Sequence, residues 1–458
     1  MATNQSEAWI SVEDIKANFA EAHPALKQKD AVDEANRCLY CYDAPCITAC
    51  PTDIDIPAFI KKIASGNMKG SAVTIMDANP SGASCARVCP TEELCEGACV
   101  LNHASTPIMI GDLQRYATDW AIKNEQVLFK KGEDTKQHIA IVGSGPAGLS
   151  AARELARFGH RVTIYEASAE AGGLNTYGIV SFRLPKEIPA WEVKQVKDLG
   201  VEIKTNTIVG KDISAAELTE QYHAVIIAAG MGRVPTLGID GEDLEGVRDA
   251  IEFVKMTKSG KWEENLSGKK VAVIGAGNTA VDAATCSVRL GAENVKMVYR
   301  RTEKEMTAYA FEYEFAKQDG IEFKWLSAPA KIEGNSSGEV TGLLVNKMKL
   351  EAAGEDGRQK VKAIEGATET LDVDLVIKAI GQERLNPLIE AFEVTHSDGV
   401  IQIDETTYAT SKNGVYAIGD IIFGKGQGEA MVVSAAQQGK KAAWAIHSEL
   451  TENAVHSA

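Results

Sequence analysis

The spacing of apolar residues along the chain changes near residue 135. Before that point, segments such as 56–66 and 110–124 carry apolar residues three and four positions apart, the spacing of amphipathic helices. After it, short apolar runs alternate with helical patterns, as in 138–166 and 269–301. Strand–helix–strand units of this kind build parallel sheets that are covered by helices. The pattern therefore predicts a helical N-terminal region followed by α/β structure.

The first strand–helix unit contains a turn with the G-x-G-x-x-G spacing, "GSGPAG". Its first glycine permits the tight turn, its second lets a pyrophosphate approach the backbone, and its third lets the helix pack on the strand. An acid at the end of the next strand is placed to hold ribose hydroxyls. A tight turn without a ligand is the alternative. The predicted dinucleotide-binding residues are Gly143, Gly145, Pro146, Ala147, Gly148 and Glu166.

The second unit contains a related turn, "GAGNTA", in which Ala280 replaces the third glycine and is still small enough for close packing. The following strand ends in Arg300 and Arg301, where an acid would favour NAD. Arginines accommodate a 2′-phosphate, so this strand end favours NADPH. Because Glu303 and Glu305 lie nearby, a solvated arginine pair is the alternative. The candidate residues are Gly275, Gly277, Asn278, Thr279, Ala280, Arg300 and Arg301.

Composition narrows the function classes. The chain has 458 residues, of which 45% are hydrophobic and 24% charged, and its formal net charge is −16. This negative charge argues against nucleic acid and against anionic membrane surfaces as partners. No apolar run approaches the roughly 20 residues that span a bilayer, and the first residues lack the apolar core of a signal peptide. We expect a cytoplasmic protein that binds neither nucleic acid nor a membrane.

Of the nine cysteines, only Cys286 lies outside residues 38–99. Disulfides are not expected in a reducing compartment. Zinc ribbons typically present two C-x₂-C pairs, whereas this chain has one. A run ending in Cys-Pro is typical of two-cluster ferredoxin domains, so eight thiolates would suffice for two [4Fe–4S] clusters. Zinc and structural thiols are the alternatives. The two groups are Cys38, Cys41, Cys46 and Cys50, and Cys85, Cys89, Cys95 and Cys99.

The same region resembles a known family. The segments "CLYCYDAPCITACPTDIDIPAFI", "NPSGASCARVCPTEELCEGACVL" and "PIMIGDLQRYATD" are similar to the N-terminal iron–sulfur domain of dihydropyrimidine dehydrogenase. The remainder resembles the FAD and NAD(P)H domains that follow it there, so the resemblance covers essentially the whole chain. The family's FMN barrel is not part of this sequence, which resembles the smaller, FAD-containing subunit of the bacterial two-subunit enzyme. The small subunit of glutamate synthase is similar, with the same three domains.

The resemblance implies a ligand set that spacing alone does not provide. Cys85, the eighth ligand by composition, would bind no iron, and Gln114 of the "IGDLQ" segment would take its place. The alternative for Gln114 is an exposed helix glutamine. Glutamate synthases tend to carry Glu at this position, which makes the pyrimidine enzyme the better match. The implied ligands are Cys38, Cys41, Cys46 and Cys99 for one cluster, and Cys50, Cys89, Cys95 and Gln114 for the other.

Further cofactor contacts follow from the resemblance alone. "GGL" and "VYAIGD" accompany FAD sites, "SFRLP" supplies an arginine to the flavin, and "KAIG" lies near the nicotinamide. Thr307 stands where the family has a further basic residue for the 2′-phosphate. This difference leaves NADH as the alternative nucleotide. A surface salt bridge is the alternative for the arginine. The implied residues are Gly173, Leu174, Arg183, Gly419, Asp420, Ala379 and Gly381.

Together these features predict an α/β fold with an N-terminal α-helical ferredoxin-like domain and two Rossmann-type domains, one inserted in the other. The predicted domains are 1–135 (two [4Fe–4S] clusters), 136–232 with 382–458 (FAD), and 233–381 (NAD(P)H). The resemblance implies the electron-input subunit of dihydropyrimidine dehydrogenase, an oxidoreductase that works with an FMN-containing catalytic subunit in a heterotetramer. The alternatives are the small subunit of glutamate synthase, a bifurcating oxidoreductase subunit, and a zinc- or redox-sensing regulator.

Overall fold

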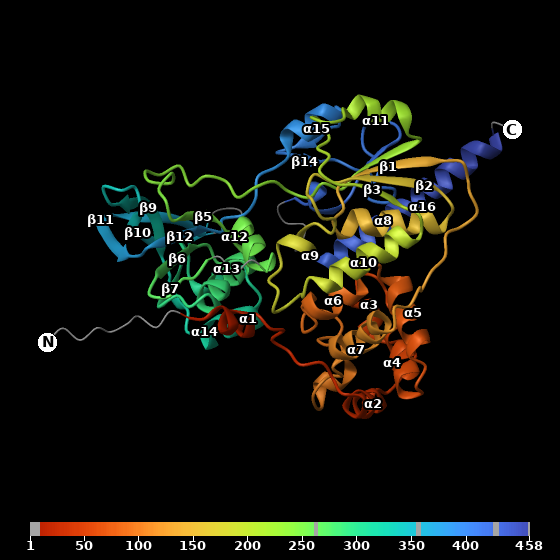
Figure 1. The fold of residues 1–458 in the computed structure, drawn as a ribbon, viewed down its shortest axis with the longest axis horizontal. Helices are drawn as coiled ribbons and strands as arrows, with labels where there is room; N and C mark the ends of the chain where they lie inside the picture. The colour runs from red at the N-terminus through yellow and green to blue at the C-terminus, as the bar shows by residue number, and fades with distance from the viewer. Residues whose placement is uncertain (1–9, 261–263, 354–358, 425–429, 457–458) are drawn as a thin grey trace. The chain divides into compact units, whose positions relative to one another are not determined.

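The computed structural model describes residues 10–260, 264–353, 359–424 and 430–456 (Figure 1). It divides into two compact units. The first unit consists of the described parts of Met1–Ala22, Tyr177–Phe182 and Gly232–Glu383, and the second of those of His23–Thr176, Arg183–Met231 and Arg384–Ala458. In the described residues, no helix combines the length and apolar character needed to cross a bilayer.

The α/β part of the second unit is built around a parallel sheet with the strand order β15-β4-β1-β2-β3. Its strands are β1 (His138–Val142), β2 (Arg161–Tyr165), β3 (Glu202–Lys204), β4 (Ala224–Ile227) and β15 (Val415–Ala417). The chain leaves this sheet after β4 and returns with β15, so another domain is inserted between the two. β1 and β4 are apolar and almost fully buried because helices cover both faces of the sheet. These helices are α8 (Pro146–Arg157), α10 (Glu187–Asp198), α11 (Ala215–Gln221), α15 (Asn386–Phe392) and α16 (Val432–His456).

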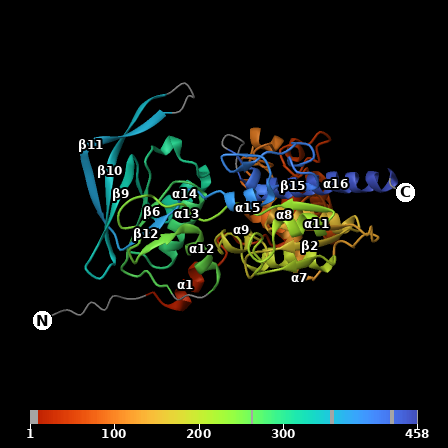
Figure 2. The same ribbon diagram turned by 90° about the horizontal axis from the view of Figure 1, so that it is seen from above.

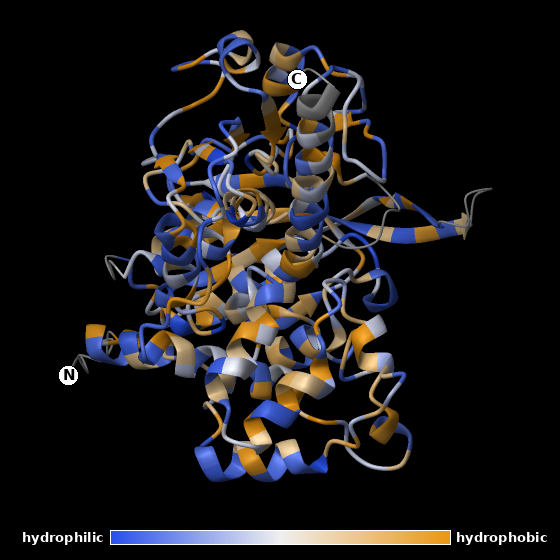
Figure 3. Cartoon of the chain, turned by 90° about the vertical axis from the view of Figure 1, so that its right-hand side faces the viewer, coloured by the Kyte–Doolittle hydropathy of each residue, from blue (hydrophilic) through white to orange (hydrophobic). Residues whose placement is uncertain are grey.

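The helical part of the second unit precedes this sheet in the chain. Its helices are α2 (Gln28–Arg37), α3 (Pro45–Thr48), α4 (Ile56–Ala64), α5 (Met68–Ala78), α6 (Gly82–Val88) and α7 (Ile110–Lys123). Asp55 caps α4 and Asn67 caps α5, each by accepting a backbone N–H of the first turn. α2, at the bottom of Figures 1 and 3, is mostly hydrophilic and buries only Ala31 and Ala35. The helices expected from the spacing over 56–66 and 110–124 are therefore confirmed as α4 and α7.

The first unit has a second parallel sheet, with the order β5-β12-β6-β7-β8. Its strands are β5 (Val247–Asp249), β6 (Lys270–Ile274), β7 (Asn294–Val298), β8 (Glu322–Lys324) and β12 (Leu375–Lys378). The helices α12 (Ala250–Lys258), α13 (Asn278–Arg289) and α14 (Ala310–Gln318) belong to this unit. A separate antiparallel sheet consists of β9 (Ser327–Gly334), β10 (Val340–Ala353) and β11 (Gln359–Asp372). Figure 2 shows β10 and β11 as a long hairpin that extends from the unit.

The described N-terminal residues 10–22, with α1 (Val12–Asn18), pack on the first unit. The sequence predicts them as part of the helical domain 1–135. In the structure Ile15 and Phe19 are buried in the core that also contains Phe253, which holds the segment on the first unit. The Asn18 amide donates a hydrogen bond to Arg289 O at 3.1 Å. The structure thus attaches this segment to the inserted domain, while the other predicted domain limits stay predictions.

Candidate cofactor-binding sites

The turn between β1 and α8 has the shape of a phosphate cradle. Gly143 has φ +100°, and a Cβ at this position would lie 2.4 Å from Ala228 O, so only glycine fits. A Cβ on Gly148 would lie 2.1 Å from Gly143 O, which brings α8 directly onto the turn. A Cβ on Gly145 would meet no atom within 4 Å. This open side, beside the backbone N–H groups of the α8 N-terminus, fits the pyrophosphate of a dinucleotide.

Glu166 lies directly beside this turn and is buried. Its Oε2 accepts hydrogen bonds from Ser144 N at 3.0 Å and Ser144 Oγ at 2.5 Å, and its Oε1 accepts one from Ser168 N at 2.7 Å. These bonds hold the carboxylate at the carboxyl end of the sheet. Each oxygen retains acceptor capacity, so the carboxylate fits the hydroxyls of a ribose. The contact between Glu166 and a ribose stays a prediction.

Two further predicted segments meet the same turn. A Cβ on Gly173 would lie 2.7 Å from the Gly145 Cα, so the "GGL" loop lies against the cradle. Leu174, next to it, is half-exposed. A Cβ on Gly419, which has φ +76°, would lie 3.1 Å from the Ala147 Cβ. Residues from three distant parts of the sequence therefore surround the start of α8, as an FAD site requires.

Asp420 and Arg183, the other predicted flavin contacts, occupy different surroundings. Burial raises the pKa of the Asp420 carboxyl, and Arg384 opposes this shift. Arg384 also donates a hydrogen bond to Asp420 O at 3.2 Å. Arg183 is half-buried in the loop that precedes α10. The roles of Asp420 at the ribityl chain and of Arg183 at the flavin stay predictions.

The pattern of residue types did not identify Gln438 of α16, whose Oε1 accepts a hydrogen bond from Gly419 N at 2.7 Å. Its neighbour Gly439 packs against α8, since a Cβ there would lie 2.2 Å from Ala147 O. A glycine inside an otherwise helical sequence, such as Gly439, is the kind of signal from which this close approach could have been predicted.

The turn between β6 and α13 forms a second cradle, in the first unit. Gly275 has φ +140°, and a Cβ there would lie 2.3 Å from Ala379 O. The "KAIG" loop, 378–381, therefore lies beside the turn. Asn278 Oδ1 accepts a hydrogen bond from Tyr309 N at 3.1 Å, and Ala280 is fully buried. Gly277, Thr279 and Gly381 belong to the same two segments, and their contacts with a nucleotide stay predictions.

The two predicted phosphate-binding arginines differ in their surroundings. Arg301 Nη1 donates a hydrogen bond to Gln359 O of β11 at 3.0 Å. Arg300 is exposed, and within the described residues no hydrogen bond or ion pair holds its side chain. Glu305 accepts from Thr302 N and Oγ1, at 3.0 and 2.6 Å, which turns this carboxylate toward its own helix cap. Arg300 is therefore the member of the pair that is available for a 2′-phosphate.

Thr307, at the family's third basic position, lies against the second glycine turn. Its N–H donates to Ala276 O at 3.2 Å, and a Cβ on Gly277 would lie 3.3 Å from its Oγ1. A short hydroxyl at this position has no charge to offer a phosphate. The prediction of a 2′-phosphate site consequently rests on Arg300.

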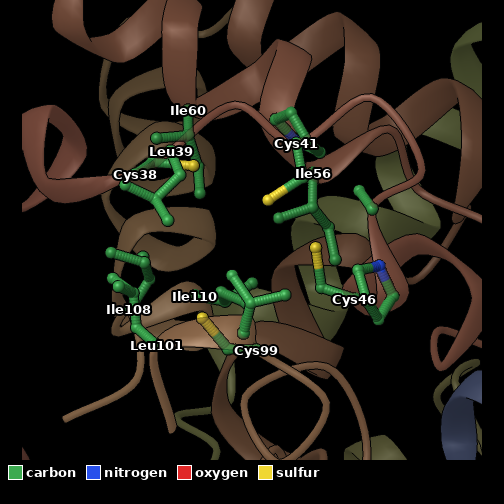
Figure 4. Close-up of a pocket in the computed structure, with 14 residues that line it drawn as sticks. Cys38, Leu39, Cys41, Cys46, Ile56, Ile60, Cys99, Leu101, Ile108 and Ile110 are labelled. Carbon is green, nitrogen blue, oxygen red and sulfur yellow. The ribbon is translucent and has the colours of Figure 1, made fainter. Parts of the chain in front are cut away.

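Four cysteines of the helical domain surround one apolar pocket. Figure 4 shows their sulfur atoms directed toward a common space from separate chain segments. Burial raises the pKa of the Cys38 thiol and raises that of Cys46 to about 11, because an apolar wall disfavours thiolates. A cationic cluster would reverse this preference. The cysteines are Cys38, Cys41, Cys46 and Cys99, and the wall includes Leu39, Ile56, Ile60, Leu101, Ile108 and Ile110.

The remaining four cysteines gather at the end of α6. The hydrogen bond with Cys85, then burial, then the charges of Cys85, Cys95 and Cys50 raise the pKa of Cys89. Burial and the neighbouring Glu96 raise the pKa of Cys95. The structure thus brings the proposed ligands Cys50, Cys89 and Cys95 together, with Cys85 among them.

Gln114 of α7 is only 7% exposed, so the alternative of an exposed helix glutamine is wrong. Its Nε2 donates a hydrogen bond to Gly82 O at 2.7 Å. This bond fixes the amide plane and leaves Oε1 as the atom that would bind iron. The choice between Gln114 and Cys85 as a ligand stays a prediction, because Cys85 is buried as well.

The spacing of these side chains suits clusters better than single ions. Within the described ranges, no three His, Cys, Asp or Glu side chains converge on a single-ion site. Zinc would require sulfur atoms about 2.3 Å from one centre. In a [4Fe–4S] cluster each thiolate binds a different iron, so the cysteines surround a wider space. The apolar pocket, with four cysteines around it, fits this arrangement.

Family models match both parts of the chain. Residues 15–126 match "dihydropyrimidine dehydrogenase domain II, 4Fe-4S cluster". Residues 137–439, more than half of the chain, match "pyridine nucleotide-disulphide oxidoreductase". The chain belongs to the pyridine nucleotide-disulphide oxidoreductase family. It is an oxidoreductase that carries an iron–sulfur domain, and its cofactors are FAD, a nicotinamide nucleotide and iron–sulfur clusters.

Curated relatives are subunits of larger enzymes. The chain is 34% identical over 432 residues to the NAD-dependent dihydropyrimidine dehydrogenase subunit PreT of Salmonella typhimurium, covering 94% of this chain and 97% of the relative. It is 33% identical to the glutamate synthase [NADPH] small chain of Azospirillum brasilense, covering 94% and 92%. It is 36% identical to the NADP(+)-dependent formate dehydrogenase subunit beta of Moorella thermoacetica, and spans 60% of that relative's length. The chain is thus an electron-transfer flavin and iron–sulfur oxidoreductase of this group.

A solved structure supports the fold. Mycobacterium tuberculosis FprA in complex with NADPH matches 70% of this chain and 86% of its own, with a TM-score of 0.56 and 22% sequence identity. At this identity the likeness establishes the fold alone. The predicted fold class, an α-helical iron–sulfur domain with two Rossmann-type domains, is confirmed.

Proposed function

We propose that the chain is the electron-input subunit of an NAD(P)-dependent dihydropyrimidine dehydrogenase. The observation that carries this proposal is Gln114, which is buried and whose amide nitrogen is bonded to Gly82 O of α6, the helix that also carries Cys85. The resemblance to dihydropyrimidine dehydrogenases implies a glutamine ligand at this position. The PreT relative, which the chain covers almost completely, supports the same assignment.

Each cofactor has residues that fit it. The N-terminus of α8 and the cradle around Gly145 would hold the FAD pyrophosphate, with Glu166 at the ribose and Asp420 at the ribityl chain. The cradle around Gly277 would hold NAD(P)H. When bound, the nicotinamide supplies a hydride to the flavin, and the clusters carry the electrons onward one at a time. The protein's own task is to bind and orient these groups and to exclude water from them.

The partner subunit is expected to contain FMN and to reduce uracil or thymine at the 5,6 double bond, within a heterotetramer. The names of the relatives as subunits and small chains support the existence of a partner. Alone, the chain should oxidise NAD(P)H with an artificial acceptor and reduce no pyrimidine. Uracil reduction by the isolated chain would contradict this division of labour.

The second candidate is the small subunit of glutamate synthase, supported by the Azospirillum relative, of which the chain covers 92%. Co-purification from the native cell separates the two candidates. An FMN-containing partner whose complex consumes NAD(P)H with uracil supports the first candidate. A complex that consumes NAD(P)H only with glutamine and 2-oxoglutarate supports the second.

Arg300→Ala tests the nucleotide preference. Arg300 is exposed and available, so its loss should raise the KM for NADPH about tenfold and leave the KM for NADH nearly unchanged. Arg301→Ala is the matched control, because Arg301 is already bonded to Gln359 O. Steady-state oxidation of each nucleotide with ferricyanide as acceptor measures both constants. Equal effects on the two nucleotides would refute the assignment of Arg300 to a 2′-phosphate.

A further inference from the structure

Residues 437–440 of α16 connect the flavin side of the second unit with its helical domain. On the flavin side, Gln438 Oε1 accepts a hydrogen bond from Gly419 N at 2.7 Å. Gly439 packs against α8, where a Cβ would lie 2.2 Å from Ala147 O. The helix that contacts the FAD cradle therefore has little freedom to shift along α8.

On the other side, Lys440 reaches into the helical domain. Its Nζ donates hydrogen bonds to Ala78 O at 2.7 Å and to Thr52 O at 3.3 Å. Thr52 Oγ1 in turn lies 3.4 Å from the Cys50 Sγ. One residue, Thr52, thus contacts both the buried ammonium group and a proposed cluster ligand.

A second buried cation supports this contact. Arg153 Nη2 donates to Asp77 O at 2.9 Å, and Arg153 Nη1 donates to Met76 O. Together with Lys440 at Ala78 O, two cations of the α/β part bind the last three carbonyl groups of α5. A helix C-terminus carries partial negative charge, so positive side chains are favourable there. This arrangement fixes the helical domain to the flavin side.

The two cations differ in charge compensation. Arg153 pairs with Glu154 at 2.7 Å. Lys440 is 6% exposed and, within the described part of the chain, forms no ion pair at contact distance. Burial and the positive charge of Arg153 lower the pKa of its ammonium group, while the carboxylates of Glu154, Asp53 and Asp77 act against that shift. In a medium of low dielectric constant, the field of a charge that lacks a contacting counter-ion extends to its neighbours.

We propose that Lys440 is a positioning residue that holds the Cys50 cluster site against the flavin side and stabilises the reduced form of that cluster by its buried positive charge. The inference rests on the proposed function, because it requires Cys50 to bind a cluster that accepts electrons from FAD. In each transfer one electron leaves reduced FAD and one arrives on the cluster. The reduced cluster is more negative, so a nearby cation raises its potential.

The test is a potential titration, monitored by electron paramagnetic resonance, of the full chain purified without oxygen. Lys440→Met removes the charge with little change in length. It should lower the equilibrium constant for reduction of one cluster about tenfold, which is about 59 mV for one electron. The other cluster should keep its potential. Lys440→Arg keeps the charge and should keep the native reduction potential. Lys441→Met is the matched control, because Lys441 is the next residue along the helix and is exposed.

Unchanged potentials in a fully iron-loaded Lys440→Met protein would overturn the inference, as would an equal fall in Lys441→Met. If Lys440→Met binds no iron, Lys440→Gln takes its place, because glutamine keeps a hydrogen-bond donor without the charge. A native cluster potential in Lys440→Gln would also overturn the inference. If neither neutral variant binds iron while Lys440→Arg does, the result supports the need for a positive charge at this position. If Lys440→Arg binds no iron either, the proposal is refuted. A wild-type chain without flavin or iron would instead refute the proposed function.

Discussion

The two cysteine groups occupy different surroundings. Cys38, Cys41, Cys46 and Cys99 line a pocket with an apolar wall, beside which Leu39 and Tyr42 are strongly exposed. Among the described residues, the segment from Cys85 to Cys95 contains no exposed large hydrophobic side chain, although Glu92 and Glu93 are exposed. The proposed ligands also differ, because Cys99 completes the first group and Gln114 the second. The group around Cys89 is tied to the α/β part through Lys440 and Glu192. The group around Cys89 is therefore fixed to the flavin side of the unit by hydrogen bonds.

The largest expected effect separates the two groups. Cys46→Ser should remove the cluster of the apolar pocket and about half of the bound iron, because one thiolate ligand is lost. The cluster of the Cys89 group should stay, with its resonance signal intact. Iron analysis and paramagnetic resonance of the reduced protein measure this. Cys286→Ala, at a buried cysteine outside both groups, is the control. Loss of both clusters would show that the groups are not independent, and loss of neither would show that Cys46 is not a required ligand.

A smaller effect is expected inside the Cys89 group. Gln114→Ala should change the spectrum and lower the stability of one cluster, whereas Cys85→Ala should leave both clusters in place. The reason is that the Gln114 amide is oriented by its bond to Gly82 O, with Oε1 left as a ligand atom. Iron content and resonance spectra of the two variants decide between them. Iron loss in Cys85→Ala with an unaltered Gln114→Ala would make Cys85 the eighth ligand.

The smallest effect concerns the attachment of α6. Glu192 accepts hydrogen bonds from Ser84 N at 2.8 Å and Ser84 Oγ at 2.6 Å. Burial raises the pKa of its carboxyl from 4.5 to about 7. The folded state therefore holds a proton that the unfolded state loses, and stability falls as the pH rises from 4.5 to about 7.

Glu192→Gln should abolish this pH dependence, which amounts to about 3 kcal/mol at most. Thermal unfolding at pH 5 and pH 8 measures it, with Glu187→Gln, an exposed position on the same helix, as the control. A variant that keeps the native loss of stability between these pH values would show that Glu192 does not titrate as described.

The sequence predicted the parts of the fold that depend on local pattern. The glycine turns at 143–148 and 275–280 and the helices α4 and α7 follow from spacing and apolar periodicity, whereas the insertion of one Rossmann-type domain was implied by a family resemblance. The antiparallel β9–β11 sheet was not predicted, because β11 is exposed along most of its length and lacks an apolar pattern. The placement of residues 10–22 depends on Phe253 and Phe182, which are distant in sequence.

The sequence predicted which residues belong to the site, but only some of the contacts between them. Cysteine spacing identified eight candidate thiolates, but the grouping of Cys99 with the first three cysteines and the choice of Gln114 over Cys85 came from a family resemblance. Lys440 and Glu192 were missed because a lysine or glutamate in an amphipathic helix usually faces solvent. Their burial arises from the packing of α16 and α10 on the helical domain, which no local pattern encodes.

The most direct test of the central claim is anaerobic addition of NAD(P)H to the purified chain, with iron analysis and paramagnetic resonance. We predict about eight iron atoms per chain, bleaching of the flavin and two distinct reduced-cluster signals, because both groups of four ligands hold a [4Fe–4S] cluster connected to FAD. About four iron atoms with a single signal, or clusters that NAD(P)H leaves oxidised while the flavin is bleached, would contradict the account.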